Sequence, residues 1–403
     1  MALFRSFKHL PFTFLWSGQT ISRLGDSLYR IALAWWVLEK TGSAAIMGTV
    51  MIFSFTPMLI FMLIGGVAVD RYSRVKVMIL SDVLRGLAVL IVAALAFTGL
   101  LEVWHIYIAS ILFGLVDAFF QPAYTAVVPQ ITPRELLPSA NSLTSLSGQF
   151  ANIAGPALGA ALVVMGGTAF SFALDGLSFF LSAALLLPLL KLPKPPQVET
   201  EKQSMLQDIK VGFKAVLSST WLWLTIAMAA LGNVFYSGPI SVSLPFLVKT
   251  NLGGNVNALG WILSATAIGS VLGAIWFGRY TRLRKRGLIA YGGWIVSGLM
   301  MMVYGLPVPL AVILLAALVN GIGNTTSGLI WVNTLQEMVP GDLLGRVSSI
   351  DMIGSFVLLP VGYGLAGVFT DQFGAPLVFV IGGVVSALLA AGCLFSPAIR
   401  NLD

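Results

Sequence analysis

About a dozen long apolar stretches, separated by short polar connections, dominate this sequence of 403 residues. One membrane crossing by a helix takes about 20 apolar residues. Charged residues make up only 10% of the chain, whereas about 25% is typical of a soluble domain. A water-soluble fold of this length could not cover its surface with so few charges. The pattern therefore predicts an all-α membrane protein with twelve transmembrane helices.

The predicted helices begin and end where turn-forming residues interrupt the apolar runs. Their ranges are 12–38, 44–69, 77–100, 104–128, 138–165, 169–190, 220–247, 257–278, 288–304, 308–335, 345–370 and 375–394. A polar segment with several Pro, Lys and Glu residues separates the sixth from the seventh. We therefore expect a six-helix bundle over residues 1–190, a linker over 191–219 and a second six-helix bundle over 220–403.

Lys and Arg residues gather in the connections on one side of the predicted membrane, and the other side has only Lys40 and Lys249. The positive-inside rule then places both termini and the linker in the cytoplasm of a multi-pass protein of the inner, or plasma, membrane. This bias accounts for the net charge of +7, so we expect the lipid bilayer, and no nucleic acid, as a partner.

The two predicted bundles repeat one another at a constant offset. The segment Pro133–Leu137 matches Pro340–Leu344. The same offset pairs Gly66 with Gly273, Gly114 with Gly321, and Gly155 with Gly362. Two pseudo-symmetric halves are a transporter architecture, in which the substrate site is expected between the halves and access alternates between the two sides of the membrane.

The connection after the second predicted helix contains Gly66, Asp70, Arg71 and Arg74. Gly66 has no side chain, so a neighbouring helix can approach it closely. Asp70 can accept hydrogen bonds from a helix N-terminus. We expect this segment to latch one half to the other in one conformation. The alternative is a charged turn that only obeys the positive-inside rule.

Asp82 and Arg85 lie three residues apart in the third predicted helix. Residues at this spacing lie on adjacent turns of one helical face. We expect them to relay charge to the predicted latch, and the alternative is an ion pair near the lipid headgroups.

The fifth predicted helix carries Asn152, Gly155, Pro156 and Gly159. Small residues permit close helix contact, and a proline removes one backbone hydrogen bond and can bend the helix. Asn152 is a candidate for the substrate cavity. Generic packing of small residues is the alternative interpretation of this segment.

Four polar residues share one face of the first predicted helix at spacings of four, three and four, namely Gln19, Arg23, Asp26 and Arg30. Ionisable groups at membrane depth are costly and mark functional sites. We expect Gln19 to line the substrate cavity and the three charged residues to take part in proton coupling. The alternative is a structural ion pair between Asp26 and either arginine.

Asp117, Gln121 and Tyr124 form a polar stripe on the fourth predicted helix. Asp117 has no cationic residue close to it in the sequence, so it is the preferred candidate for reversible protonation, with Gln121 beside it. Tyr124 is a cavity candidate. We expect Asp175, in the sixth predicted helix, to be structural and to lie near the outer surface.

The second half contains little predicted buried charge. Its cavity candidates are Asn233, Tyr236, Asn320 and Asn324. Neutral hydrogen-bonding groups beside aromatic surfaces suit a bulky, mostly apolar substrate.

Taken together, these segments resemble one branch of the major facilitator superfamily, which includes macrolide efflux proteins, multidrug exporters and enterobactin exporters. The resemblance rests on Arg23-Leu-Gly-Asp26, on Gly66 to Lys76, and on Asp82-Val-Leu-Arg85. It also rests on Gly155-Pro156, which is similar to the antiporter motif of drug exporters. The resemblance implies the major facilitator fold and efflux of lipophilic small molecules by proton antiport. A siderophore exporter and a lysophospholipid flippase on the same scaffold are the alternatives.

Other classes of protein find no support in the sequence. It contains no Gly-x-x-x-x-Gly-Lys-Ser/Thr phosphate loop and no His-Glu-x-x-His motif, and it has one cysteine and two histidines. We therefore expect no enzyme activity, no cofactor and no metal site, and a chain that functions as a monomer.

Overall fold

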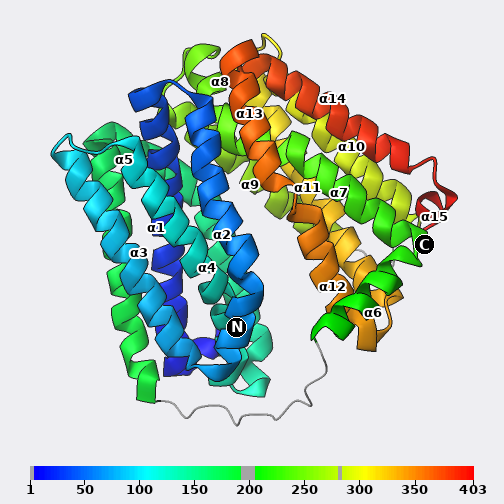
Figure 1. The fold of residues 1–403 in the computed structure, drawn as a ribbon, viewed down its shortest axis with the longest axis horizontal. Coiled ribbons are helices and arrows are strands. Elements are labelled where there is room, and N and C mark those ends of the chain that lie inside the picture. Colours follow the sequence, from blue (N-terminus) through cyan, green and yellow to red (C-terminus); the bar gives the residue numbers. More distant parts are fainter. Residues whose placement is uncertain (1–3, 192–204, 280–283) are drawn as a thin grey trace. The chain divides into compact units, whose positions relative to one another are not determined.

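The computed structural model describes residues 4–191, 205–279 and 284–403, and this part of the chain is helical and contains no strand (Figure 1). Contacts divide the chain into two compact units. Unit 1 comprises residues 1–42 and 49–198, and unit 2 comprises residues 43–48 and 199–403. Residues 43–48 group with unit 2, where Asp371 accepts hydrogen bonds from Ser43 Oγ and the Ala44 backbone N–H, each at 2.6 Å.

Unit 1 is built on five long helices, of which the second has its first turn, residues 44–48, grouped with unit 2. These are α1 (Leu10–Thr41), α2 (Ala44–Arg71), α3 (Arg74–Phe97), α4 (Val103–Ile131) and α5 (Leu137–Leu186). Short 3-10 turns lie at Arg5–Lys8, Arg134–Leu136 and Leu187–Lys191. Helix α5 packs against α1 and α3, and α3 also packs against α4. The helices α1, α3, α4 and α5 therefore pack around the interior of unit 1.

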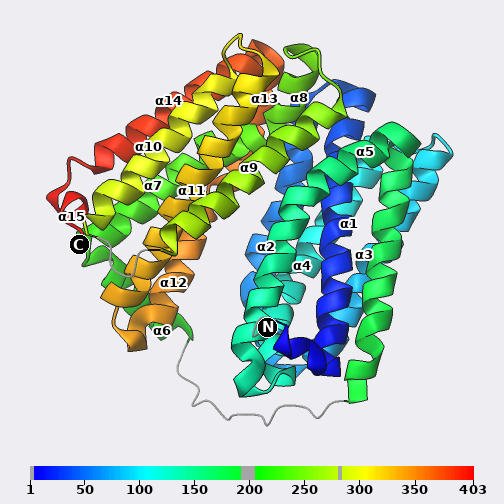
Figure 2. The same ribbon diagram turned by 180° about the vertical axis from the view of Figure 1, so that it is seen from behind.

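Gly167 divides α5 into the two helices that the sequence predicts over 138–165 and 169–190. Its backbone, with φ 77° and ψ 175°, is not helical, and such a positive φ favours glycine. Figure 2 shows the two arms of α5 extending side by side from the turn, so the chain runs along them in opposite directions. The two predicted crossings are thus present as the two arms of α5.

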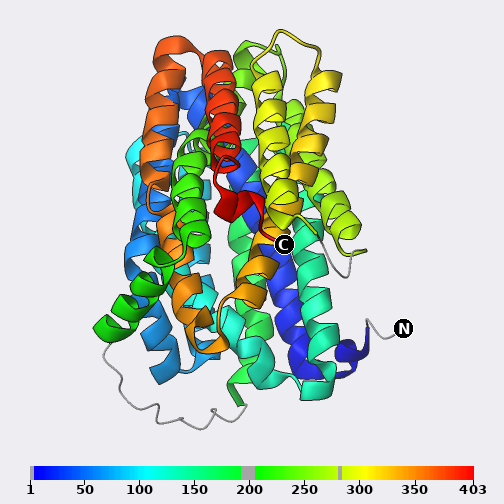
Figure 3. The same cartoon turned by 90° about the vertical axis from the view of Figure 1, so that its right-hand side faces the viewer.

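Unit 2 contains α6 (Met205–Leu217), α7 (Thr220–Gly238), α8 (Leu244–Thr250), α9 (Val256–Phe277), α10 (Arg286–Tyr304), α11 (Leu310–Met338), α12 (Gly341–Phe356), α13 (Leu359–Phe373), α14 (Ala375–Cys393) and α15 (Pro397–Arg400). A π-helical turn at Pro239–Ser243 joins α7 to α8. Helix α10 packs against α11 and α14, α9 packs against α11, and α7 packs against α13 and α14. Figure 3 shows these long helices running alongside one another.

Two helices predicted as continuous are interrupted in unit 2. The predicted helix 220–247 is divided into α7, the π-helical turn and α8, with Pro239 and Pro245 at the junctions. The predicted helix 345–370 is divided between α12 and α13, with Pro360 at the start of α13. Proline lacks the backbone N–H that a continuous helix needs, which accounts for both breaks.

Ten helices of the described chain are long and apolar enough to cross a membrane. One of them, Arg134–Lys191, has 58 residues and contains both arms of α5. Helix α1, with 32 residues, is long enough but falls outside this set because its charged face lowers its hydropathy. Counting α1 and the two arms of α5 separately gives the twelve predicted crossings.

The predicted linker falls partly on residues 192–204, which lie outside the described residues. Its remaining part contains α6, which packs against α12 and α7. Part of the linker range is therefore a helix of unit 2.

The repeat seen in the sequence has a structural counterpart in close helix contacts. A Cβ at Gly155 would overlap Ser27 of α1, and a Cβ at Gly362 would overlap Val234 of α7. In the same way, Gly114 contacts the α2 backbone at Ser54, and Gly321 contacts the α9 backbone at Thr266. Each unit therefore places these two repeated glycines at a close contact between two helices.

Within the described part of unit 1, no neighbouring helix approaches Gly66 closely. No atom of the described residues lies within 4 Å of a Cβ built at Gly66, whereas one built at Gly65 would overlap the α4 backbone at Ala118. Gly273, the repeat partner of Gly66, does contact a neighbouring backbone, at Ile322 of α11. In unit 1 the contact is thus shifted by one residue.

Candidate functional site

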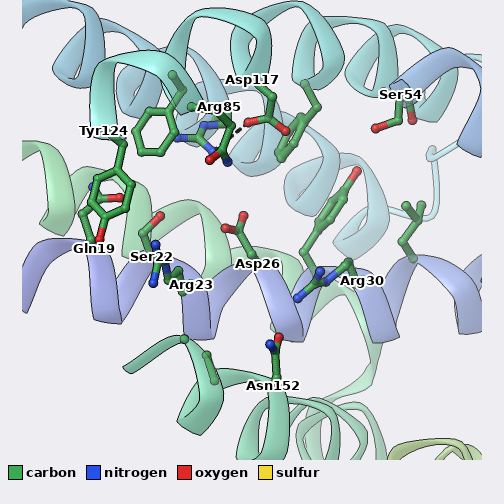
Figure 4. Close-up of a pocket in the computed structure, with 18 of the residues that line it drawn as sticks. Gln19, Ser22, Arg23, Asp26, Arg30, Ser54, Arg85, Asp117, Tyr124 and Asn152 are labelled. Carbon is green, nitrogen blue, oxygen red and sulfur yellow. Dashed lines mark hydrogen bonds and ion pairs between the residues drawn. The ribbon is translucent and has the colours of Figure 1, made fainter. Parts of the chain in front are cut away.

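Unit 1 contains an open cavity of about 510 Å³ lined by α1, α2, α3, α4 and α5 (Figure 4). All four polar residues of the predicted α1 face line it, together with the three predicted candidates of α4 and the one of α5. These residues are Gln19, Arg23, Asp26, Arg30, Asp117, Gln121, Tyr124 and Asn152. The helical spacing of the sequence thus brings one predicted set of side chains into one cavity.

Arg85 of α3 is the centre of a buried charge network beside this cavity. Its Nη2 donates to Asp82 Oδ1 at 2.8 Å, and its Nη1 donates to Asp117 Oδ1 at 3.2 Å. Asp82 is 0% exposed and Arg85 is 3% exposed. Buried ions need paired and hydrogen-bonded partners, and a guanidinium can meet two carboxylates at once.

Neighbouring side chains complete the surroundings of this network. Ser182 Oγ of α5 donates to Asp82 Oδ2 at 2.8 Å, and Gln19 Nε2 donates to Ser182 Oγ at 3.0 Å. The Arg85 guanidinium also lies 4.2 Å from the ring centre of Phe120 and 4.6 Å from that of Phe179. Aromatic faces attract cations, so both rings add to the stabilisation of Arg85.

Asp26 differs from the other acids because it faces the cavity without a close partner. The described residues offer its carboxylate no hydrogen bond and no ion pair within 4.0 Å. Arg23 instead donates to the Thr144 carbonyl at 3.2 Å, and Arg30 donates to Ser27 Oγ at 3.1 Å. The alternative interpretation of a structural ion pair between Asp26 and either arginine is therefore wrong.

The structure changes the roles predicted for the acids of α3 and α4. Asp117 has a cationic partner, Arg85, which the sequence did not reveal because it comes from another helix. Asp82 and Arg85 lie in the interior of unit 1, and Arg85 also pairs with Asp117 of α4. The predicted relay from this pair to the latch would involve Asp70. The side chain of Asp70 is not among the described residues, so the relay stays a prediction.

Asp175 lies deep inside unit 1 rather than near an outer surface. It is 0% exposed, and a Cβ on Gly25, in the middle of α1, would overlap its Oδ1. Among the described residues, its Oδ2 has no hydrogen-bond partner, and Oδ1 accepts only a long bond of 3.4 Å from Ser178. Asp175 and Asp26 are close enough to interact electrostatically. The sequence prediction of a peripheral acid is therefore wrong.

The predicted latch is only partly described. The side chain of Asp70 lies outside the described residues. Arg71 is exposed, and Arg74 Nη1 donates to the Ala126 carbonyl at 3.0 Å and to Gln130 Oε1 at 3.3 Å. Arg74 therefore joins the start of α3 to the end of α4 within unit 1, and the latch itself stays a prediction.

The glycines of the predicted antiporter motif lie on the face of α5 that packs against α1. Gly155 faces Ser27, Gly159 faces Leu28 and Ile31, and Pro156 lies between them. The close helix contact that the small residues predicted is present.

Unit 2 contains a separate cavity of about 320 Å³. Asn233, Tyr236 and Asn324 line it, as the sequence predicts. Asn320 does not, because it is fully buried, where it accepts a hydrogen bond from the Tyr236 hydroxyl at 2.6 Å and donates to the Ser297 carbonyl at 2.9 Å. Asn320 therefore positions Tyr236 instead of facing a substrate.

Sequence reasoning missed Asp351 of α12. Its carboxylate lines the unit 2 cavity and accepts hydrogen bonds from Trp331 Nε1 at 3.1 Å and Ser355 Oγ at 3.3 Å. The second half was expected to be poor in buried charge. The signal that could have revealed Asp351 was a lone acid within a predicted transmembrane helix.

The sequence profile of the Major Facilitator Superfamily matches residues 15–357, and a second match covers residues 229–401. The chain belongs to the Major Facilitator Superfamily. This family consists of transporters, so the chain is a transporter and not an enzyme, and it is a multi-pass membrane protein. The resemblance inferred from the motifs is confirmed, as is the major facilitator fold.

Curated relatives fall in the branch that the motifs indicated. Macrolide efflux protein A of Streptococcus pyogenes is 24% identical over 398 residues, which is 98% of each chain. The multidrug efflux pump Tap of Mycolicibacterium fortuitum is 28% identical over 94% of each chain. The enterobactin exporter EntS of Citrobacter koseri is 27% identical over 94% of this chain and 92% of its own length.

A solved structure of a POT family transporter in complex with 5-aminolevulinic acid has the same fold. Its TM-score is 0.77, with 12% identity and 96% of each chain covered. At this identity the likeness concerns the fold alone.

Proposed function

We propose that this transporter exports lipophilic small molecules across the inner membrane by antiport with protons, with alternating access and with both termini in the cytoplasm. The observation that carries the proposal is the position of Asp26. It is a carboxylate at membrane depth that faces a cavity and has no ion pair in the described structure.

The charges around the unit 1 cavity favour binding of one proton. Three arginines, Arg23, Arg30 and Arg85, lie among four aspartates, namely Asp26, Asp82, Asp117 and Asp175. With every group ionised this set carries a formal charge of −1. An uncompensated charge is costly in a low-dielectric interior, so one bound proton stabilises the set by making it neutral.

Access to the cavity and the lack of an ion pair together select Asp26 as the group that exchanges this proton. Asp82 and Asp117 both form an ion pair with Arg85, and a proton on either acid would weaken that pair. Asp175 is sealed from the cavity, and its closeness to Asp26 disfavours ionisation of both together. Asp26 is the remaining acid, and protons can reach it through the cavity.

The unit 2 cavity supports a lipophilic substrate. Its walls include Trp294, Trp331 and Met352, with a small number of polar groups such as Asn233 and Asn324. Cavities of this kind bind mostly apolar ligands and orient them through a few hydrogen bonds. The similarity to a macrolide efflux protein and to a multidrug efflux pump supports a lipophilic substrate.

Siderophore export is the second candidate, and the similarity to EntS favours it. A metabolite exporter of this type would use the same proton site with a different substrate. A panel of substrates therefore separates the two candidates without changing the coupling mechanism.

The test is uptake into inverted membrane vesicles with an acidified lumen, using a macrolide, a lipophilic dye and a catecholate siderophore. Vesicles without the transporter are the control. We expect accumulation of the macrolide or the dye, and its loss when an uncoupler dissipates the pH gradient. Accumulation that survives the uncoupler would contradict proton antiport, and accumulation of the siderophore alone would favour the second candidate.

A further inference from the structure

Asp351 lies at membrane depth in unit 2 without a cationic partner. It lies in α12, ten residues after Gly341, and inside the apolar stretch Leu343–Phe373. Its only hydrogen bonds in the described structure come from two neutral donors, Trp331 and Ser355. Neutral donors stabilise a carboxylate but do not balance its charge. The carboxylate is half-buried and opens onto the 320 Å³ cavity.

No Lys, Arg or His side chain lines this cavity among the described residues. Arg346, the nearest cation along α12, packs against Gly212 of α6 and is not part of the cavity wall. The position of Asp351 therefore differs from that of Asp82 and Asp117, each of which has an arginine within 3.2 Å. A proton or a bound cationic ligand can balance this charge, and the open cavity beside the carboxylate gives a ligand access to it.

The other walls of the cavity suit the apolar body of such a ligand. Trp294 and Trp331 offer aromatic faces, which attract cations and apolar groups alike. Met228, Met352 and Phe356 add apolar surface that can adapt to different shapes. Asn324 is exposed and has no hydrogen bond within the described chain, so it can bind a polar group of the ligand.

From these contacts we propose that Asp351 binds the positive charge of a lipophilic monovalent cation, so that this transporter selects amphiphilic amines and related cations as substrates. The inference rests on the proposed export of lipophilic molecules and narrows it to one charge class. Trp331 positions the carboxylate through its Nε1–H, and the aromatic and apolar walls bind the body of the cation. An anion of the same size meets the same walls but is repelled by Asp351.

Two probes of nearly the same shape and opposite charge test this proposal, namely tetraphenylphosphonium and tetraphenylborate. Their binding to the purified protein in neutral detergent is measured by equilibrium dialysis, with protein-free micelles as the background. We expect the wild type to bind the phosphonium at least tenfold more tightly than the borate. The Asp351→Asn variant should lose about tenfold or more in phosphonium affinity, with no loss of borate affinity.

Two further variants separate charge from shape. Trp331→Phe keeps the carboxylate and an aromatic ring but removes the Nε1–H that positions the carboxylate, so it should weaken the preference for the phosphonium less than Asp351→Asn does. Glu337→Gln removes an exposed carboxylate of unit 2 outside the cavity and should bind both probes like the wild type. Unchanged phosphonium binding in Asp351→Asn would overturn the proposal, as would a loss of preference in Trp331→Phe as large as that in Asp351→Asn.

If Asp351→Asn does not fold, the wild-type protein alone still tests the proposal. Equal binding of the two ions by the wild type would overturn it. Dialysis needs no proton gradient. A failure of proton-driven transport in vesicles would therefore contradict the proposed function and leave the binding result standing, and equal binding of the two probes would overturn only the role of Asp351.

Discussion

Arg85 on α3 joins Asp82 on its own helix to Asp117 on α4, with N–O distances of 2.8 and 3.2 Å. One guanidinium thus forms ion pairs with two carboxylates in the interior of unit 1. Breaking a buried pair by removing one partner costs about 3–5 kcal/mol, because the other charge stays buried and uncompensated. The pairing therefore contributes to the stability of the unit as well as to its electrostatics.

Replacing Arg85 with Ala should accordingly lower the stability of the protein by about 3–5 kcal/mol. Arg85→Lys should lose part of this, since an ammonium group does not match the fork geometry of a guanidinium. The midpoint of thermal unfolding in detergent measures both effects. The matched control is Lys40→Met, which removes an exposed ion pair with Glu102 and should change the stability by less than about 1 kcal/mol. Equal midpoints for Arg85→Ala and the control would contradict this role.

The Asp26→Asn variant should lose accumulation of substrate against its gradient, because an amide cannot take up a proton at this position. Downhill exchange of labelled for unlabelled substrate should continue, since exchange needs no net proton movement. Both are measured in the same vesicles. Glu135→Gln, an exposed carboxylate, serves as the control and should transport like the wild type. If Asp26→Asn still accumulates substrate, another group carries the proton.

Close helix packing makes a separate prediction about the repeated glycines. Gly155→Ala and Gly362→Ala place a methyl group against Ser27 and Val234, respectively, and overpacking of this kind costs about 1–3 kcal/mol. Gly328→Ala in α11 meets no atom of the described residues within 4 Å, so it should be neutral or raise the stability by up to about 1 kcal/mol. Thermal unfolding of the three variants measures the difference. Similar midpoints for all three would show that these contacts do not constrain the helices.

The latch interpretation predicts that Asp70→Asn changes the rate of transport with little effect on expression, because it alters the balance between two conformations. Initial rates of uptake, normalised to the amount of protein, provide the measurement. Rates equal to those of the wild type would contradict the latch and favour the alternative, a charged turn that only determines topology.

The sequence predicted the residues of the unit 1 cavity better than their partners. Helical periodicity alone placed Gln19, Arg23, Asp26 and Arg30 on one face of α1, and all four line the cavity. The partner of Asp117 was not predictable in this way, because Arg85 comes from another helix and 32 residues earlier in the chain. Periodicity reports faces within a helix, whereas the pairing of helices decides which charges meet.

Errors of detail have similar physical causes. The break at Gly167 and the interruption of two helices of unit 2 near Pro239 and Pro360 are backbone events that an apolar run conceals. Close packing occurs at Gly65 and not at Gly66 because the rotation of α2 relative to α4 decides which of two adjacent glycines faces its neighbour. Asp351 was overlooked because it has no charged residue near it to form a recognisable pattern.

Proton antiport is tested most directly by measuring luminal pH in liposomes that contain the purified transporter. A pH-sensitive dye is enclosed, the membrane potential is clamped, and substrate is added outside. We predict that the lumen becomes alkaline as substrate enters, because each inward step of substrate releases a proton outward, and that liposomes with Asp26→Asn show no such change. Substrate entry into wild-type liposomes at constant luminal pH would contradict the account.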